Sequence, residues 1–206
     1  MMVWFRPRFN LMAAVFYLLV AGLFPLGFAT TAQLPHMAGG VLTTCQALAC
    51  FLAQSDPWGD DYRSGRLDLW LSQSASPWAL VLQRALSAGA GEGAPMVGAT
   101  ALLAILYDVP PNQWTHAMLV SALTFCGLLS ASHGLGSWLL GSRGSPYRMA
   151  LLLGPLVAPV LIVSAQAMVQ PTNTTLLWCL AGLVGGMAGP MAALACWGLR
   201  HAAAQR

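Results

Sequence analysis

The residues of this chain that could carry chemistry are few and widely spaced. Glu92 is the single acid of residues 85–107, and His133 lies in a long stretch without charge. A carboxylate or an imidazole in apolar surroundings is costly and points first to a role in proton or substrate handling. The plainer interpretation is that Glu92 reaches water and that His133 forms a hydrogen bond to a neighbouring element. His36 and His116 could ligate haem iron, but no companion motif accompanies them.

Some reactions are excluded because a required residue type is missing. All nine basic residues are arginine, so the chain has no lysine for an ATP-binding loop or a Schiff base. No Cys-x-x-Cys pair occurs, so neither a zinc site nor a disulfide framework is predicted. We expect no catalytic residue and no resident metal. The cysteines, which we expect to pack between helices, are Cys45, Cys50, Cys126, Cys179 and Cys196.

The elements that position these residues must lie in a membrane. Only 7% of the residues are charged, whereas a soluble domain carries roughly 25%. This excludes an ordinary soluble domain, a disordered chain and a nucleic-acid-binding protein. Asp, Glu, Lys and Arg are absent from residues 10–55, 109–142 and 149–199. Because a spanning helix needs about 20 apolar residues, these stretches hold two, one and two helices, and residues 85–107 hold one more.

The sequence therefore predicts an all-α polytopic membrane protein with one domain over residues 1–206 and six transmembrane helices. Breaks that contain polar residues and proline, at 30–36 and 170–174, divide the two longest charge-free stretches. The predicted spans are about 11–30, 37–54, 86–107, 115–140, 149–169 and 175–198.

The arginines support this count independently. With six spans, every arginine lies on one side of the membrane, and the opposite side has only Asp108. Positive residues are retained in the cytoplasm, so both termini are predicted to be cytoplasmic. The first apolar run is longer than a signal-peptide core, which favours an uncleaved first helix. The arginines are Arg6, Arg8, Arg63, Arg66, Arg84, Arg143, Arg148, Arg200 and Arg206.

Four glycines in the last span have the spacing of a helix contact. Gly182 and Gly186 are four residues apart, and so are Gly185 and Gly189. Small residues at this spacing let two membrane helices approach closely. We therefore predict helix packing at these glycines, which says nothing about function.

The longest hydrophilic stretch, between the second and third spans, predicts a short amphipathic helix over residues 59–71. Asp60 and Asp61 stand where a helix would begin, and Arg63 and Arg66 follow, which suits the helix dipole. Gly65 would mark a bend between two shorter helices. The apolar residues of this stretch form a wide face, and they are Tyr62, Leu67, Leu69, Trp70 and Leu71.

The order of these features resembles the CcmB family, haem exporter protein B. Residues 23–27, Leu-Phe-Pro-Leu-Gly, are similar to the first span of that family. Residues 60–71 are similar to its cytoplasmic segment, and residues 128–168 to its fourth and fifth spans. The proline-rich stretch that follows the cytoplasmic segment in the family is reduced here to Pro77.

The resemblance implies a permease subunit of the ABC-type complex for cytochrome c maturation in the bacterial inner membrane. It implies a CcmA-like partner that binds ATP, a CcmC-like haem-handling subunit, a small CcmD-like subunit and a CcmE-like haem chaperone. Haem would be cargo of the complex, with none bound tightly by this chain. The 59–71 segment would dock on the ATPase as a coupling helix, through Asp60, Asp61, Tyr62, Arg63, Gly65, Arg66, Leu67, Leu69, Trp70 and Leu71.

Two other functions stay open at this point. The chain could be the permease subunit of a different ABC-2-like exporter, for a lipid, a polysaccharide or a drug. It could also be an intramembrane redox protein or enzyme that uses Glu92, His116 and His133. The first would have an ATPase partner without a role in cytochrome c assembly, whereas the second would be active as an isolated chain.

Overall fold

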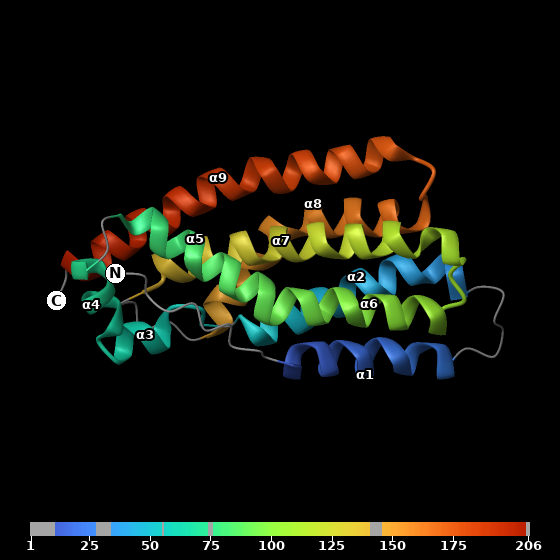
Figure 1. The fold of residues 1–206 in the computed structure, drawn as a ribbon, viewed down its shortest axis with the longest axis horizontal. Coiled ribbons are helices and arrows are strands. Elements are labelled where there is room, and N and C mark those ends of the chain that lie inside the picture. Colours follow the sequence, from blue (N-terminus) through green and yellow to red (C-terminus); the bar gives the residue numbers. More distant parts are fainter. Residues whose placement is uncertain (1–10, 28–33, 55, 74–75, 141–145, 205–206) are drawn as a thin grey trace.

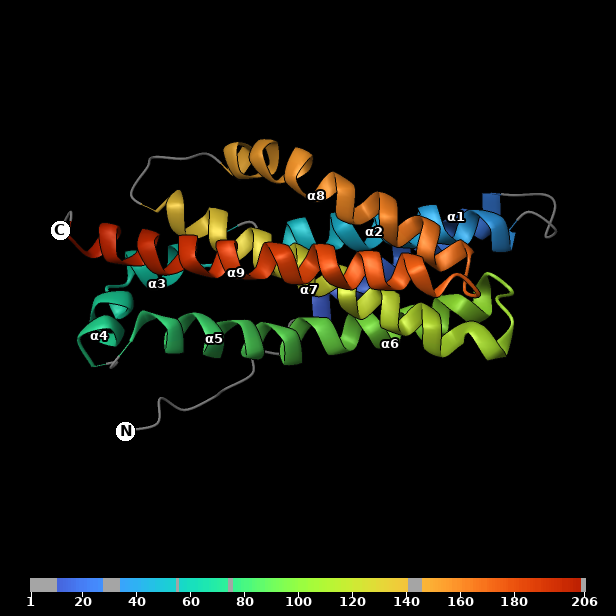
Figure 2. The ribbon, with the colours of Figure 1, turned by 90° about the horizontal axis from the view of Figure 1, so that it is seen from above.

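The computed structural model describes residues 11–27, 34–54, 56–73, 76–140 and 146–204. Within these ranges the chain is helical apart from short turns and contains no strand. The long helices run along one common direction and form an elongated bundle (Figure 1 and Figure 2). The structure confirms the all-α polytopic membrane fold that the charge-free stretches predict.

The bundle is built from long helices joined by short connections. The long helices are α1 (Leu11–Gly27), α2 (Leu34–Ala53), α5 (Pro77–Ala88), α6 (Ala94–Leu106), α7 (Trp114–Trp138), α8 (Pro146–Val169) and α9 (Thr174–Ala204). A π turn over Gly89–Gly93 joins α5 to α6 in one continuous helical stretch. Two short helices, α3 (Gly59–Arg63) and α4 (Arg66–Gln73), lie between α2 and α5, and a 3-10 turn over Pro111–Gln113 precedes α7.

Each predicted span coincides with a long helix. Five helical stretches of the described chain are long and apolar enough to cross a membrane, and α1 is a shorter apolar helix. Residues 28–30 of the first predicted span lie outside the described residues. The helix of the third span begins at Pro77, ahead of the predicted residue 86. It begins there because Ser76 Oγ accepts a hydrogen bond from the Ala79 amide at 3.3 Å and proline suits the first helical position.

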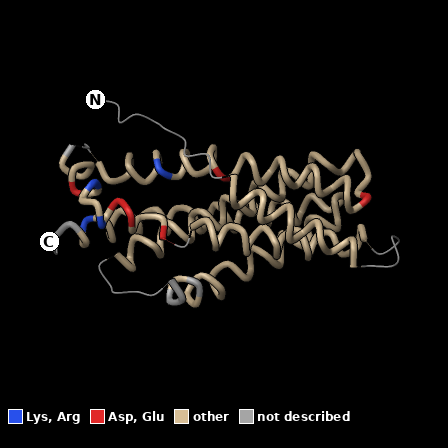
Figure 3. Tube along the Cα trace, turned by 90° about the horizontal axis from the view of Figure 1, so that it is seen from below, with Lys and Arg blue, Asp and Glu red and all other residues tan. Residues whose placement is uncertain are grey.

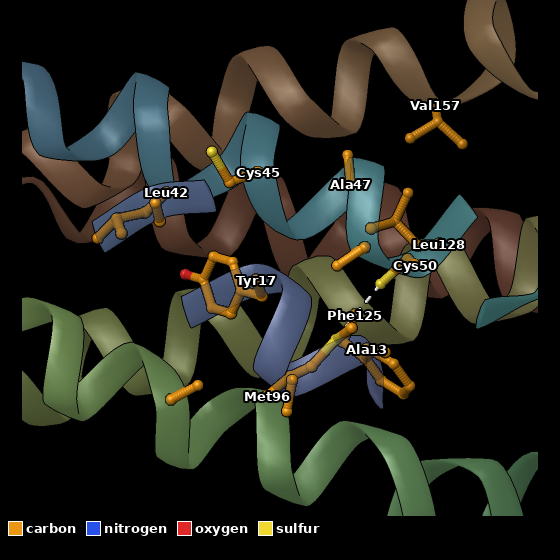
Figure 4. Close-up of a cluster of buried hydrophobic side chains, with 14 of the residues drawn as sticks. Ala13, Tyr17, Leu42, Cys45, Ala47, Cys50, Met96, Phe125, Leu128 and Val157 are labelled. Atoms are coloured by element: carbon orange, nitrogen blue, oxygen red, sulfur yellow. Dashed lines mark hydrogen bonds between the residues drawn. The ribbon is translucent and has the colours of Figure 1, made fainter. Parts of the chain in front are cut away.

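The central helix of the bundle is α7, which packs against α2, α6, α8 and α9. Its contact with α9 depends on glycine, since a Cβ atom added at Gly198 would lie 2.8 Å from the backbone carbonyl of Ser137. On another side of α7, the buried side chains of Tyr17, Leu42 and Phe125 come together from α1, α2 and α7 (Figure 4). The core is therefore formed mainly by small residues and by a few large side chains.

Polar side chains inside this core pair with one another across four helices. Tyr17 Oη lies 3.3 Å from Thr100 Oγ1, which lies 2.9 Å from Ser121 Oγ. Gln46 donates to the backbone carbonyl of Ser121 at 2.9 Å, but its side-chain oxygen has no hydrogen-bond partner among the described residues. Because polar groups in an apolar medium need internal partners, this network fixes α1, α2, α6 and α7 relative to one another.

The described charges gather toward one end of the bundle (Figure 3). Arg63 and Arg66 belong to α3 and α4 at that end, Arg84 to α5, and Arg200 to the last turns of α9. Asp108 follows α6 at the opposite end. The segregation of arginine predicted from six spans therefore holds for these residues. Arg148 belongs to the first turn of α8, and Arg6, Arg8, Arg143 and Arg206 lie outside the described residues.

Candidate functional site

The 59–71 segment forms two short helices, α3 and α4, at the charged end of the bundle (Figure 1). Gly65 stands between them with a φ of +70°. This left-handed conformation is easy for glycine and strained for other residues, so the chain turns at this point. The bend predicted at Gly65 is confirmed, and the segment is a hinged pair of helices, not one continuous helix.

The residues just before the segment attach it to the end of α7. The Trp58 side chain is 1% exposed, and its indole Nε1 donates to the backbone carbonyl of His133 at 3.0 Å. The rings of Trp58 and His133 pack with centroids 5.6 Å apart. Pro57 lies against Gly136, where an added Cβ atom would approach the proline Cγ to 2.6 Å. His133 thus supports Trp58 near the charged end of α7.

A buried carboxylate attaches the segment to α5. The Asp61 side chain is 2% exposed, and it lies 3.4 Å from Arg84 of α5 and 3.4 Å from Arg66 of α4. Arg84 also donates to the backbone carbonyl of Pro57 at 3.0 Å. A buried carboxylate without a counter-ion is strongly destabilising, so these two arginines make the position of Asp61 possible.

Leu67 gives α4 an apolar attachment. Its side chain is fully buried in a small cluster that joins the segment to α5 and α9. The other buried members of that cluster are Trp58, Val81, Ala195, Cys196 and Leu199. Together with Trp58 and Asp61, this side chain connects the 59–71 segment to α5, α7 and α9.

The outer face of the segment carries the exposed predicted residues, which are Asp60, Arg63, Arg66 and Leu69, whereas Tyr62 and Leu71 pack against the inner cluster. Leu69 is 58% exposed although it is apolar. Arg63 is exposed and lies 2.8 Å from Asp60 and 3.2 Å from Asp56. The hydrogen bond that Arg63 donates to Asp60 and the charge of Asp56 raise the pKa of the Arg63 guanidinium. Exposed pairs of this kind add little stability.

The predicted docking residues therefore divide into two groups. Asp60, Arg63, Arg66 and Leu69 are exposed, and Tyr62, Trp70 and Leu71 are half-buried. Asp61 and Leu67 point into the chain and are not available to another protein. Sequence reasoning placed all of them on one docking surface because it did not separate the inner face of the segment from its outer face. The attachments formed by Trp58, Arg84 and His133 were not predicted.

Glu92 lies in the π turn over Gly89–Gly93, between α5 and α6. Its Oε2 accepts a hydrogen bond at 3.4 Å from Gln54, the residue that follows α2. The Gln54 side-chain oxygen in turn accepts a hydrogen bond from the hydroxyl of Ser132 in α7. Glu92 is half-buried and paired, so it belongs to a chain of polar contacts that joins the end of α2, the π turn and α7.

The three residues of the intramembrane-enzyme alternative are not brought together. His116 stands near the start of α7, and its Nε2 lies 2.9 Å from the backbone carbonyl of Ala167. Seventeen residues of helix separate it from His133, which is about 25 Å. Glu92 contacts Gln54 and not either histidine. Among the described residues, no group of three or more His, Cys, Asp or Glu is placed to hold a metal ion.

The glycines of the last span lie on an outward face of α9. A Cβ atom added at Gly182, Gly185, Gly186 or Gly189 would have nothing within 4 Å among the described residues. No helix of the described part of the chain packs against these four glycines. Helix packing at these positions stays a prediction.

The chain matches a known protein family. The family model described as CcmB protein matches residues 3–205, which is nearly the whole chain. A search of curated proteins finds no match.

Proposed function

Since the chain belongs to the CcmB family, and is therefore a permease subunit of the ABC system for cytochrome c maturation and haem export, we propose that it transmits ATP-driven movement from a partner. The partner is a CcmA-like subunit that binds and hydrolyses ATP. This chain has no lysine for an ATP-binding loop, so the energy must come from another protein. The chain itself acts as a transporter subunit and not as a catalyst.

The observation that carries the proposal is the construction of the 59–71 segment. Its outer face presents an exposed leucine, Leu69, beside charged residues, as a docking surface would. Its inner face is fixed to α5, α7 and α9 by Trp58, Asp61 and Leu67. A partner that moves the outer face would therefore move three membrane helices together.

The charged end of the bundle is proposed to face the cytoplasm. Arg63, Arg66, Arg84 and Arg200 lie at that end, and Asp108 lies at the other. Arginine near the ends of spans is retained on the cytoplasmic side, where ATP is available. In this orientation both termini are cytoplasmic and the protein spans the bacterial inner membrane.

Movement of the ATPase would drive the later steps. The ATPase dimer closes on ATP and reopens after hydrolysis, and the 59–71 segment would tilt with it. The resulting shift of the membrane helices would serve haem export or release of the haem-loaded, CcmE-like chaperone. A CcmC-like subunit and a small CcmD-like subunit would complete the complex. Haem is cargo in this scheme, and no residue of this chain is assigned to bind it tightly.

The docking surface can be tested by changing its exposed residues. Leu69→Asp combined with Trp70→Asp is expected to abolish copurification with the ATPase while the chain still enters the membrane. Ser72→Asp is the matched control, because Ser72 is an exposed residue of the same helix. Leu69→Asp alone, at the more exposed position, separates lost docking from disturbed folding. Full copurification of both Leu69 variants would overturn the assignment.

The role in cytochrome c maturation has its own readout. Cells that carry the docking-defective chain should fail to accumulate c-type cytochromes, which haem staining of membrane proteins detects. Normal cytochrome levels together with lost ATPase binding would instead favour an exporter of another substrate.

A further inference from the structure

We propose that Asp61, shared between Arg84 and Arg66, is the joint through which the 59–71 segment moves α5. Trp58, held by His133, is the second attachment point and acts on α7. This inference rests on the proposed function and names the positioning residues that it requires. Except for the exposed Arg66, none of them lies on the outer face that would bind the ATPase.

Charge pairs with two arginines hold Asp61 in place, without an aligned hydrogen bond at its Oδ2 atom. Its Oδ1 lies 3.4 Å from Arg66 and its Oδ2 3.4 Å from Arg84. The Oδ2 atom is buried but makes no hydrogen bond among the described residues. Charge attraction at this distance is weakly directional, whereas a hydrogen bond requires alignment. The carboxylate can therefore shift between the two arginines without becoming an unpaired buried charge.

Arg84 contacts both Asp61 and the backbone beside Trp58. It donates to the Pro57 carbonyl at 3.0 Å and also faces Asp61. The residue after Pro57 is Trp58, whose indole donates to the His133 carbonyl. A displacement of the segment thus reaches α5 through a charge pair and α7 through a buried aromatic side chain.

Both α5 and α7 are connected to the π turn over Gly89–Gly93. Ser132, next to His133 in α7, donates to Gln54, and Gln54 donates to Glu92. Glu92 lies in the π turn at the end of α5. A π turn is a common site of bending in a helix. A movement of α5 or of α7 would therefore displace the π turn at Gly89–Gly93, where the helix can bend.

The test uses the full complex with its ATPase and compares Asp61→Asn with Arg84→Gln. Both variants are expected to retain ATPase copurification and ATP hydrolysis. The yield of c-type cytochrome per assembled complex should fall by about two- to thirtyfold, the size of effect by which substitutions modulate coupling between sites. Asp61→Glu should restore most of the yield, because it keeps the charge. Asp108→Asn, which removes an exposed carboxylate at the opposite end of the bundle, should leave the yield unchanged.

The double variant gives the decisive comparison. If the two residues act through each other, Asp61→Asn with Arg84→Gln should lose no more yield than the worse single variant. Multiplied losses, or an unchanged yield in the single variants, would overturn the joint. Loss of copurification in Asp61→Asn but not in Asp61→Glu would overturn it too, since the residue would then be needed for docking.

Two outcomes separate this inference from the proposed function. If Leu69→Asp does not weaken ATPase binding, the docking assignment fails whatever Asp61 does. If Leu69→Asp abolishes binding but Asp61→Asn loses neither binding nor cytochrome yield, the docking surface stands and the joint fails. Should Asp61→Asn be absent from the membrane, the exchanged pair Asp61→Arg with Arg84→Asp tests the same contact, and an assembled but inactive exchanged pair would contradict a joint based on charge.

Discussion

The close contact between α7 and α9 gives a quantitative prediction at Gly198. An alanine there would place its Cβ 2.8 Å from the carbonyl carbon and oxygen of Ser137, and 2.9 Å from the Ser137 hydroxyl. Two of these atoms are backbone, so the helices must separate to make room. Overpacking of this kind costs about 1–3 kcal/mol. Gly198→Ala should therefore lower the free energy of unfolding although alanine is the better helix former.

Gly182→Ala is the matched control in the same helix. A Cβ atom at Gly182 would meet nothing within 4 Å among the described residues. The substitution should be neutral or stabilising, by up to about 1 kcal/mol from helix propensity. In a chain of this size, each kcal/mol corresponds to about 2–4 °C. We expect Gly198→Ala to unfold about 2–12 °C below Gly182→Ala.

Thermal unfolding of the purified chain in detergent can be followed by the exposure of its thiols. Cys45 and Cys50 are buried and react with a maleimide dye only after unfolding. Cys126 and Cys179 are exposed and should first be replaced by serine to lower the background. Equal midpoints for Gly198→Ala and Gly182→Ala would refute the reasoning, because the clash with Ser137 would then have no cost.

Three further predictions concern single side chains. Trp58→Phe should keep a buried ring but lose the hydrogen bond to the His133 carbonyl, and so lower the free energy of unfolding by about 1 kcal/mol. If Trp58→Phe lowers the thermal unfolding midpoint as much as Trp58→Ala does, this prediction is wrong. Gln46→Met should change the free energy of unfolding by less than about 1 kcal/mol in the same assay, because it removes one weak interhelical bond and one unpaired oxygen together. His36→Ala with His116→Ala should leave the haem content of the purified complex unchanged, and disappearance of the Soret band would show that these histidines bind haem.

The fold could be predicted from the sequence because charge is so sparse in this chain. The lengths of the uncharged stretches determine how many helices each can hold, and polar residues with proline mark the breaks between them. The start of the third helix was harder to predict, since Arg84 suggested a loop. Arg84 instead lies on the helix that Ser76 caps, where Asp61 and the Pro57 carbonyl pair with it.

The candidate site could be predicted only in part. Composition and the position of Gly65 correctly indicate an amphipathic segment with a bend. Its inward and outward faces could not be assigned, because the bend ends the helical periodicity that relates Asp61 to Leu67. The contact between Trp58 and His133 joins residues 75 positions apart in sequence, and no local pattern indicates such a pair.

The π turn rotates one half of the helix that contains it relative to the other half. It has more residues per turn than an α-helix, so the side chains of α6 are out of phase with those of α5. The α5 part packs against α9, and the α6 part packs against α1 and α7. The continuous helical stretch Pro77–Leu106 can thus pack against two sets of neighbours. The π turn, with its glycines at 89, 91 and 93, determines the rotation of α6 relative to α5. Deleting a single residue there would rotate one half against the other while leaving the composition and the length of the span almost untouched.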